Sequence, residues 1–229
     1  MNLSSHSLFH FTRSKKSLQA ILLGGLRCSP IGETIPGSTL RYVVDAICFC
    51  DIPLSAISKH LEWYGPYGIG LTPAYGKSIG ATPVCYVHSA SRYLYHHKDK
   101  ESFYKQCPLT PYLKRTCGKQ HKYNCHNYYW KNFYDEKEWR AVKPDEINLY
   151  NKEEVPNLRN LKRLIDDDKS SRTNKDYYYT GKIPWNNIEY IILPTRDDVS
   201  GFVKWMNSNS IPQDLQTRII VVEQLMKDF

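Results

Sequence analysis

The sequence lacks an apolar run long enough to cross a membrane. Hydrophobic residues make up 41% of its 229 residues, yet no window approaches the roughly 18 consecutive apolar residues that a membrane-spanning helix requires. The opening stretch MNLSSHSLFHF also lacks the basic head and apolar core of a secretory signal. These absences predict a cytoplasmic protein without membrane contact, and the length fits one large domain over residues 1–229.

Two glycine-rich nucleotide-binding motifs are missing as well. The chain contains neither a Walker-type phosphate loop nor the G-x-G-x-x-G fingerprint of a dinucleotide-binding unit. Their absence counts against P-loop NTPases, kinases and Rossmann-type dehydrogenases. The sequence also shows no internal repeat and no long low-complexity tract.

The seven cysteines lack the pattern of a disulfide framework. Their number is odd and they are scattered along the chain, so we expect reduced thiols. Cys48 and Cys50 alternate with Phe49 and are expected to be small residues on one strand face. Five potential zinc ligands fit no standard knuckle spacing, so no metal site is predicted: Cys107, Cys117, His121, Cys125 and His126.

Positive charge and tyrosine are abundant instead. The chain has 31 Lys and Arg against 23 Asp and Glu, a formal net charge of +8, and 18 tyrosines, several of them in NYYWKNFY and DYYYTG. A basic protein attracts polyanions, and tyrosines stack on bases, so contact with RNA or DNA is one expectation. Because the basic residues form no dense run, an acidic protein partner or no polyanion at all are the alternatives.

The first organised unit is a strand followed by a short helix. SLFHFT alternates so that its phenylalanines face the core, while His10 and Thr12 share the opposite face. Ser14 is the expected N-cap of the helix, and Gly24-Gly25 are expected to end it. His10 and Thr12 would then line a site beside the core.

Two further strands carry acidic residues. The β-rich run through CFC stops at Asp51, which we expect to cap a helix with Pro53 in its first turn. FYDEKEWRAV predicts a strand with Glu136, Glu138 and Arg140 on one face.

The remaining segments differ in regularity. Residues about 89–132 are a polar insertion rich in Lys, His and Tyr, and about 144–182 form a charged helix and loops. The C-terminal part predicts a strand at IEYIILPT, a helix over about 197–207 and an apolar run RIIVVEQL.

This order of elements resembles the ADP-ribosyltransferase-like superfamily. The first strand matches its His-x-Thr pattern, and the first helix matches L-x-x-I-L-x-x-G-L at Leu18, Ile21, Leu22, Gly25 and Leu26. The opening is also similar to that of tRNA 2′-phosphotransferases. The resemblance implies an α+β fold, with a split mixed β-sheet, flanking helices and a polar insertion.

The same resemblance implies an NAD site. His10 and Thr12 would bind the cofactor together with a helix that bears Ser55, Ser58 and Tyr64, and Glu138 with Glu136 would be catalytic. Cleavage of the nicotinamide–ribose bond develops oxocarbenium character, which a carboxylate such as Glu138 stabilises. Glu136 would accept a proton from the acceptor.

A second resemblance covers most of the chain. LFHFT, CFCDIPLS, YGPYGIGL, YDEKEWR, IEYIILP and RIIVVEQLMKDF are similar to the AbiGi family of bacterial abortive-infection proteins. That family is described as the antitoxin of a two-gene phage-resistance system with a nucleotidyltransferase-like toxin, which implies a cognate toxin or antitoxin from a neighbouring gene.

Three functions follow as hypotheses. One is a defence protein that transfers ADP-ribose or hydrolyses NAD, and the second is a non-catalytic antitoxin that binds its toxin or the toxin's RNA substrate. The third is an RNA-processing phosphotransferase, which would need a basic cluster for which Arg13, Arg27 and Arg41 are the candidates.

Overall fold

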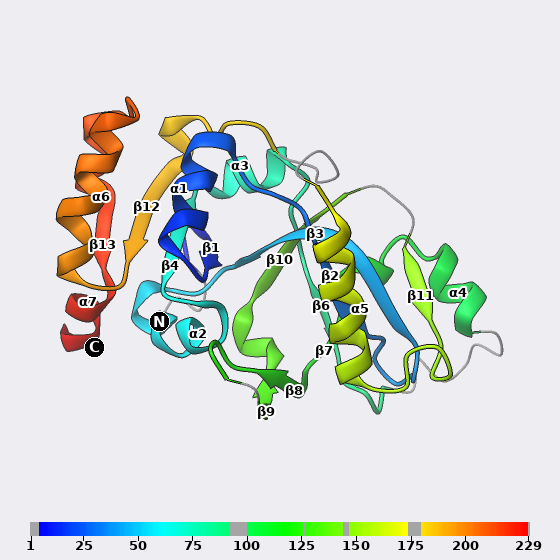
Figure 1. The fold of residues 1–229 in the computed structure, drawn as a ribbon. Coiled ribbons are helices and arrows are strands. Elements are labelled where there is room, and N and C mark those ends of the chain that lie inside the picture. Colours follow the sequence, from blue (N-terminus) through cyan, green and yellow to red (C-terminus); the bar gives the residue numbers. More distant parts are fainter. Residues whose placement is uncertain (1–4, 92–99, 126, 144–146, 174–179, 229) are drawn as a thin grey trace.

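The computed structural model describes residues 5–91, 100–125, 127–143, 147–173 and 180–228. The architecture is α+β, with a nine-stranded mixed sheet, two small two-stranded sheets and flanking helices (Figure 1). The strands are β1 (Leu8–Thr12), β2 (Ser29–Thr34), β3 (Arg41–Cys50), β4 (Tyr67–Leu71), β5 (Thr82–Pro83), β6 (Cys85–Val87), β7 (Leu113–Arg115), β8 (Cys117–His121), β9 (Tyr128–Asn132), β10 (Glu138–Val142), β11 (Asn148–Tyr150), β12 (Ile188–Leu193) and β13 (Ile219–Val221). The helices are α1 (Lys15–Gly24), α2 (Ile57–Tyr64), α3 (Pro73–Ser78), α4 (Lys100–Gln106), α5 (Leu158–Ser171), α6 (Arg196–Ser208) and α7 (Val222–Asp228).

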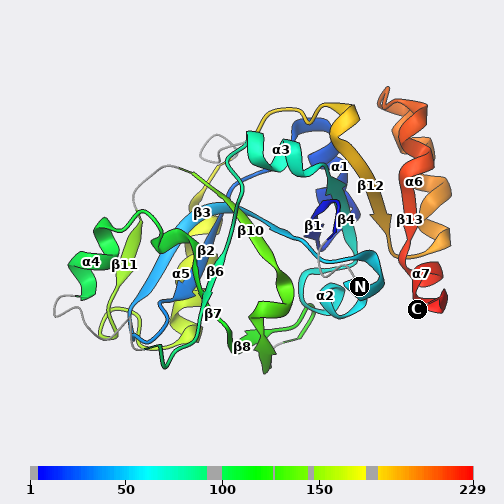
Figure 2. The ribbon, with the colours of Figure 1, turned by 180° about the vertical axis from the view of Figure 1, so that it is seen from behind.

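The large sheet splits beside its first strand. Its order is β13-β12-β4-β1-β3-β10-β5, and β2 and β11 also pair with β3. β1 pairs with β4 over its whole length, but it meets β3 only where Phe9 faces Cys50. The two strands therefore diverge toward Thr12 and leave room between them. Figure 2 shows α6 and α7 at one end of the molecule and α4 and β11 at the other.

Alternate residues of the strands enter two separate cores. Leu8 and Ile191 pack with the buried faces of α1 and α6, whereas Phe9 and Ile192 pack with Ile57 of α2. This is the period of two expected for strands covered on both sides. Leu8 and Phe9 thus hold the start of β1 in the two cores, whereas His10 and Thr12 farther along the strand are only partly buried.

The predicted first unit is confirmed. Ser14 caps α1 by accepting a hydrogen bond from the amide of Ser17, and α1 ends at Gly24. Gly25 has a φ of 91°, a conformation that favours glycine.

The prediction that Asp51 caps the next helix is wrong. Pro53 opens a 3-10 turn at Leu54–Ala56, so α2 begins only at Ile57 and Asp51 is too far away to cap it. The Asp51 carboxylate instead accepts a hydrogen bond from the amide of Ser5, at 2.6 Å.

The predicted strand over FYDEKEWRAV is only half correct. Phe133–Glu136 form a 3-10 turn, Lys137 has a left-handed φ of 46°, and β10 begins at Glu138. The left-handed residue breaks the strand pleat, so Glu136 does not share a strand face with Glu138. Arg140 does, as predicted.

The less regular segments contain more structure than their composition predicted. The described part of the insertion at about 89–132 holds α4, β7 and the β8–β9 hairpin, while residues 92–99 and 126 lie outside the description. The charged segment at about 144–182 contains β11 and α5, with 144–146 and 174–179 outside the description. β12 and α6 confirm the predicted C-terminal strand and helix, and the apolar run forms β13 and α7. Across the described ranges, no helix is sufficiently long and apolar to cross a bilayer.

Candidate functional site

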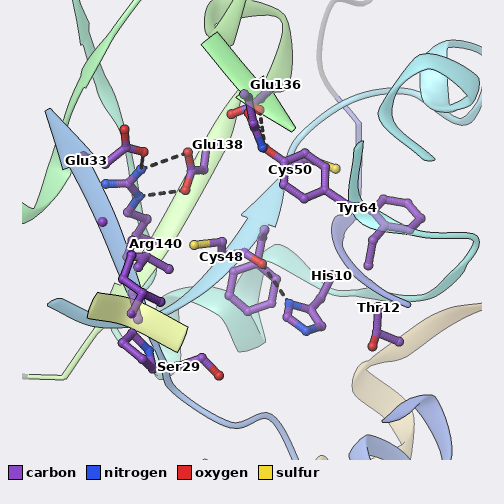
Figure 3. Close-up of a pocket in the computed structure, with 18 of the residues that line it drawn as sticks. His10, Thr12, Ser29, Glu33, Cys48, Cys50, Tyr64, Glu136, Glu138 and Arg140 are labelled. Atoms are coloured by element: carbon purple, nitrogen blue, oxygen red, sulfur yellow. Dashed lines mark hydrogen bonds and ion pairs between the residues drawn. The ribbon is translucent and has the colours of Figure 1, made fainter. Parts of the chain in front are cut away.

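A cavity of about 810 Å³ lies where β1 and β3 diverge, and it brings together residues far apart in the sequence (Figure 3). Five predicted site residues line it: His10, Thr12, Tyr64, Glu136 and Glu138. Ser55 and Ser58 do not line this cavity, and Ser55 is exposed on the turn before α2.

His10 is held on the β1 side of the cavity as a neutral ring. Its Nδ1 donates to the carbonyl of Cys48 at 2.8 Å, and the ring meets Phe49 edge-on with centroids 6.0 Å apart. Burial lowers the pKa of His10, and the hydrogen bond to Cys48 opposes this effect only in part. With the proton on Nδ1, Nε2 is left as a hydrogen-bond acceptor.

Glu138 is buried between two cations on the opposite side. Arg140 donates to both of its carboxylate oxygens, Nε to Oε1 at 2.7 Å and Nη2 to Oε2 at 3.1 Å, and Lys114 Nζ lies 2.6 Å from Oε2. Burial acts to raise the pKa of Glu138, but the charges of Arg140 and Lys114 outweigh it and hold the pKa well below its usual range. Glu138 is therefore a carboxylate with both oxygens engaged.

Glu136 is equally engaged. Its Oε2 accepts from Lys114 Nζ at 2.7 Å, and its Oε1 pairs with Lys131 and accepts the hydroxyl proton of Tyr64. Tyr64 also accepts hydrogen bonds from Lys131 at 3.1 Å and from Gln120 at 3.2 Å. Its hydroxyl is thus committed to Glu136.

A balanced ion-pair network results, formed by three carboxylates and three cations. Its members, which we call the ion-pair network, are Glu33, Lys114, Lys131, Glu136, Glu138 and Arg140. Arg140, only 1% exposed, reaches Glu33 at 2.7 Å and also donates to the Tyr42 hydroxyl at 2.7 Å. Charges buried in this way are tolerated because each has an opposite partner.

Sequence reasoning missed half of this network. Glu33 had no recognisable motif, and Lys114 and Lys131 lay in the segment interpreted as a polar insertion. Nothing in the neighbouring residues marks these two lysines as buried, because they are buried through contacts with Glu136 and Glu138, which are distant in the sequence. Only the shared face of Glu138 and Arg140 was predictable, from the alternation along the strand.

The other candidate clusters do not assemble. Among the described residues, no three His, Cys, Asp or Glu side chains are grouped so that they could hold a metal ion. His126 lies outside the described ranges, and the His121 ring packs against Tyr128 with centroids 3.7 Å apart. Arg13 and Arg27 line the cavity, whereas Arg41 lines a separate groove and donates to the carbonyl of Pro156 at 3.2 Å.

Comparison with known proteins identifies the family. No curated protein and no solved structure matches the chain, so the ADP-ribosyltransferase-like fold stays a prediction. A family model described as "Putative abortive phage resistance protein AbiGi, antitoxin" matches residues 40–194, about two thirds of the sequence. The matched region includes β3, β10 and most of the ion-pair network. The chain therefore belongs to the AbiGi family of abortive phage-resistance proteins.

Proposed function

We propose that this protein is the antitoxin of an abortive-infection pair and neutralises a cognate toxin by binding it. The family description supports the role, and the ion-pair network supports binding without catalysis. Both glutamates that a transferase would use are held by Lys114, Lys131 and Arg140. Removing one partner from a buried pair costs about 3–5 kcal/mol, so the network opposes release of Glu138 toward a substrate.

Exposed aromatic side chains on and after β9 suit a protein partner. Within the described residues, three of the large exposed hydrophobic side chains fall between positions 129 and 134, and Trp130 is 69% exposed. Lysines flank them: Lys122 lies over the Tyr129 ring at 5.4 Å, and Lys137 over the Tyr134 ring at 3.5 Å. Aromatic side chains with basic neighbours favour a partner that offers an apolar patch with an acidic rim.

Co-expression with the product of the neighbouring gene tests this proposal. The wild-type protein should co-purify with that product and restore growth, and Trp130→Glu should lose both effects. Leu109→Glu is the matched control, because Leu109 is 61% exposed elsewhere on the surface and should tolerate the charge. Failure of the wild type in both assays would refute the antitoxin role. Unchanged behaviour of Trp130→Glu would refute only this surface.

A second candidate function, favoured by the shared cavity, is an NAD-dependent ADP-ribosyltransferase or NAD glycohydrolase. His10 Nε2 and the Thr12 hydroxyl are suited to hydrogen-bond a ribose, so the β1 side fits the cofactor. The β10 side does not fit it while Glu138 remains paired with Arg140 and Lys114. Calorimetric titration with NAD and measurement of free nicotinamide test this candidate. Saturable binding that His10→Ala abolishes, together with nicotinamide release, would support it. The absence of both binding and nicotinamide release would exclude it.

A further inference from the structure

A second groove, at the N-terminal end of α5, adjoins the cavity at Lys119. A groove of about 480 Å³ is lined by residues that include Arg41, Lys119, Tyr128 and Arg159, and Lys119 lines the cavity as well. On α5, Arg159 lines the groove, whereas Lys162 and Lys169 line the cavity. These positions lie three and seven residues apart, so they form one stripe of about 15 Å along the helix. We call the cavity and groove together the α5 channel.

The α5 channel carries an excess of positive charge. Eight Lys and Arg side chains line the cavity against four carboxylates. Three of those carboxylates, Glu33, Glu136 and Glu138, belong to the ion-pair network, and the fourth, Asp166, pairs with Lys162. Besides Lys119, which lines both, the described lining of the groove adds two basic side chains, Arg41 and Arg159, and no carboxylate. The cavity lining as described therefore carries a net positive charge.

These cations crowd one another. Desolvation is the main cause that lowers the pKa of Lys169, and the charges of Arg13, Lys162 and Arg27 lower it further, against the attraction of Asp166. Burial likewise lowers the pKa of Arg41, and the nearby charge of Arg115 adds to the effect. Like charges held together in this way are relieved by a bound polyanion.

Unsatisfied polar atoms follow the same path. Thr34, only 6% exposed, lines the cavity, and its Oγ1 has no hydrogen-bond partner among the described residues. The same holds for Nε of Arg115 in the cavity wall, and for Nε of Arg41 and the Tyr128 hydroxyl in the groove. Native proteins pair nearly all such buried atoms, so their concentration along one path indicates a polar ligand.

We propose that the α5 channel binds a single-stranded nucleic acid. Its phosphates would follow Arg159, Lys162 and Lys169, with Lys119 where the cavity and the groove adjoin. A nucleotide at one end would enter the cavity, whose volume suits a ligand of that size. Tyr128, whose ring packs against His121, adds an aromatic side chain to the groove wall. This assignment goes beyond toxin binding and requires no glutamate to react.

Gly32 on β2 allows the close packing of α5 beside the cavity. A side-chain carbon at Gly32 would lie 2.6 Å from Ile165 Cδ1 and 3.1 Å from Leu161 Cγ. The absence of that carbon lets α5 pack closely on β2, which holds the basic stripe over the cavity.

Fluorescence polarisation with an eight-nucleotide labelled RNA, and with the matching DNA, tests the proposal at 0.15 M salt. Each lost phosphate contact should weaken binding about fourfold and reduce the salt slope by about 0.7 for single strands. Lys119→Ala and Arg159→Ala should both show this loss. Lys77→Ala, an exposed lysine on α3 outside the channel, should bind like the wild type.

The outcomes distinguish a nucleic-acid strand from a free nucleotide as the ligand. They also distinguish the channel proposal from the antitoxin proposal. Competition that strengthens from a mononucleotide through NAD to the octamer supports a strand, whereas equal competition by the mononucleotide would overturn the strand in favour of a free nucleotide. Absence of binding, or an equal loss in Lys77→Ala, would also overturn it. Arg159→Ala should still co-purify with the toxin, so failure of the channel is distinguishable from failure of the antitoxin role.

Discussion

Replacement of Arg140 by methionine gives the sharpest test of the ion-pair network. Arg140 is 1% exposed, and its guanidinium donates to Glu138, Glu33, the Tyr42 hydroxyl and the Pro111 carbonyl. Arg140→Met roughly keeps the volume but leaves Glu138 buried with Lys114 as its only cation. Loss of one partner of a buried ion pair costs about 3–5 kcal/mol.

That cost should be visible in thermal unfolding. For chains of about 150–250 residues, 1 kcal/mol corresponds to a shift of about 2–4 °C, so the midpoint should fall by about 6–20 °C. Circular dichroism would follow the transition. The matched control is Lys122→Ala, which removes an exposed pair with Glu62 whose side chains are 36% and 53% accessible. Exposed pairs contribute about 0–1 kcal/mol. If Arg140→Met shifts the midpoint no more than Lys122→Ala, the network is not a structural element and the argument against catalysis fails.

Three further predictions concern burial. Burial lowers the pKa of His60 from 6.5 to about 4, so the folded state favours the neutral ring and stability should fall as the pH drops from about 6.5 to 4. His60→Phe should flatten this part of the curve of unfolding free energy against pH, and an unchanged curve would contradict the assignment. Burial raises the pKa of the Cys48 thiol, whereas Cys85 is exposed. Mass spectrometry after brief alkylation of the native protein should therefore find Cys85 modified before Cys48. Modification of Cys48 first would be inconsistent with this structure. Gly32→Val would press on Leu161 and should cost about 1–3 kcal/mol in denaturant unfolding while weakening oligonucleotide binding, whereas full retention of both would refute the close packing of α5.

The sequence predicted local features better than distant ones. Alternation along SLFHFT placed His10 and Thr12 on one face, and the structure puts both at the cavity. The same reasoning failed at Glu136, because one left-handed residue, Lys137, breaks the strand before it begins. No sequence pattern predicts a lysine with a left-handed backbone conformation, because that conformation depends on the surrounding tertiary structure.

The network shows the limit more clearly. Lys114 meets Glu136 and Glu138 across more than 20 residues of chain, through strand pairings that local periodicity does not encode. The partners that engage the two glutamates were therefore invisible to motif analysis. Whether a glutamate has such partners decides if its carboxylate is available for catalysis or is used for stability.

Calorimetric titration of the purified protein with the toxin from the neighbouring gene, with NAD present and its concentration measured afterwards, tests the central claim most directly. The account predicts a saturable complex and an unchanged NAD concentration. Consumption of NAD without formation of a complex would contradict it.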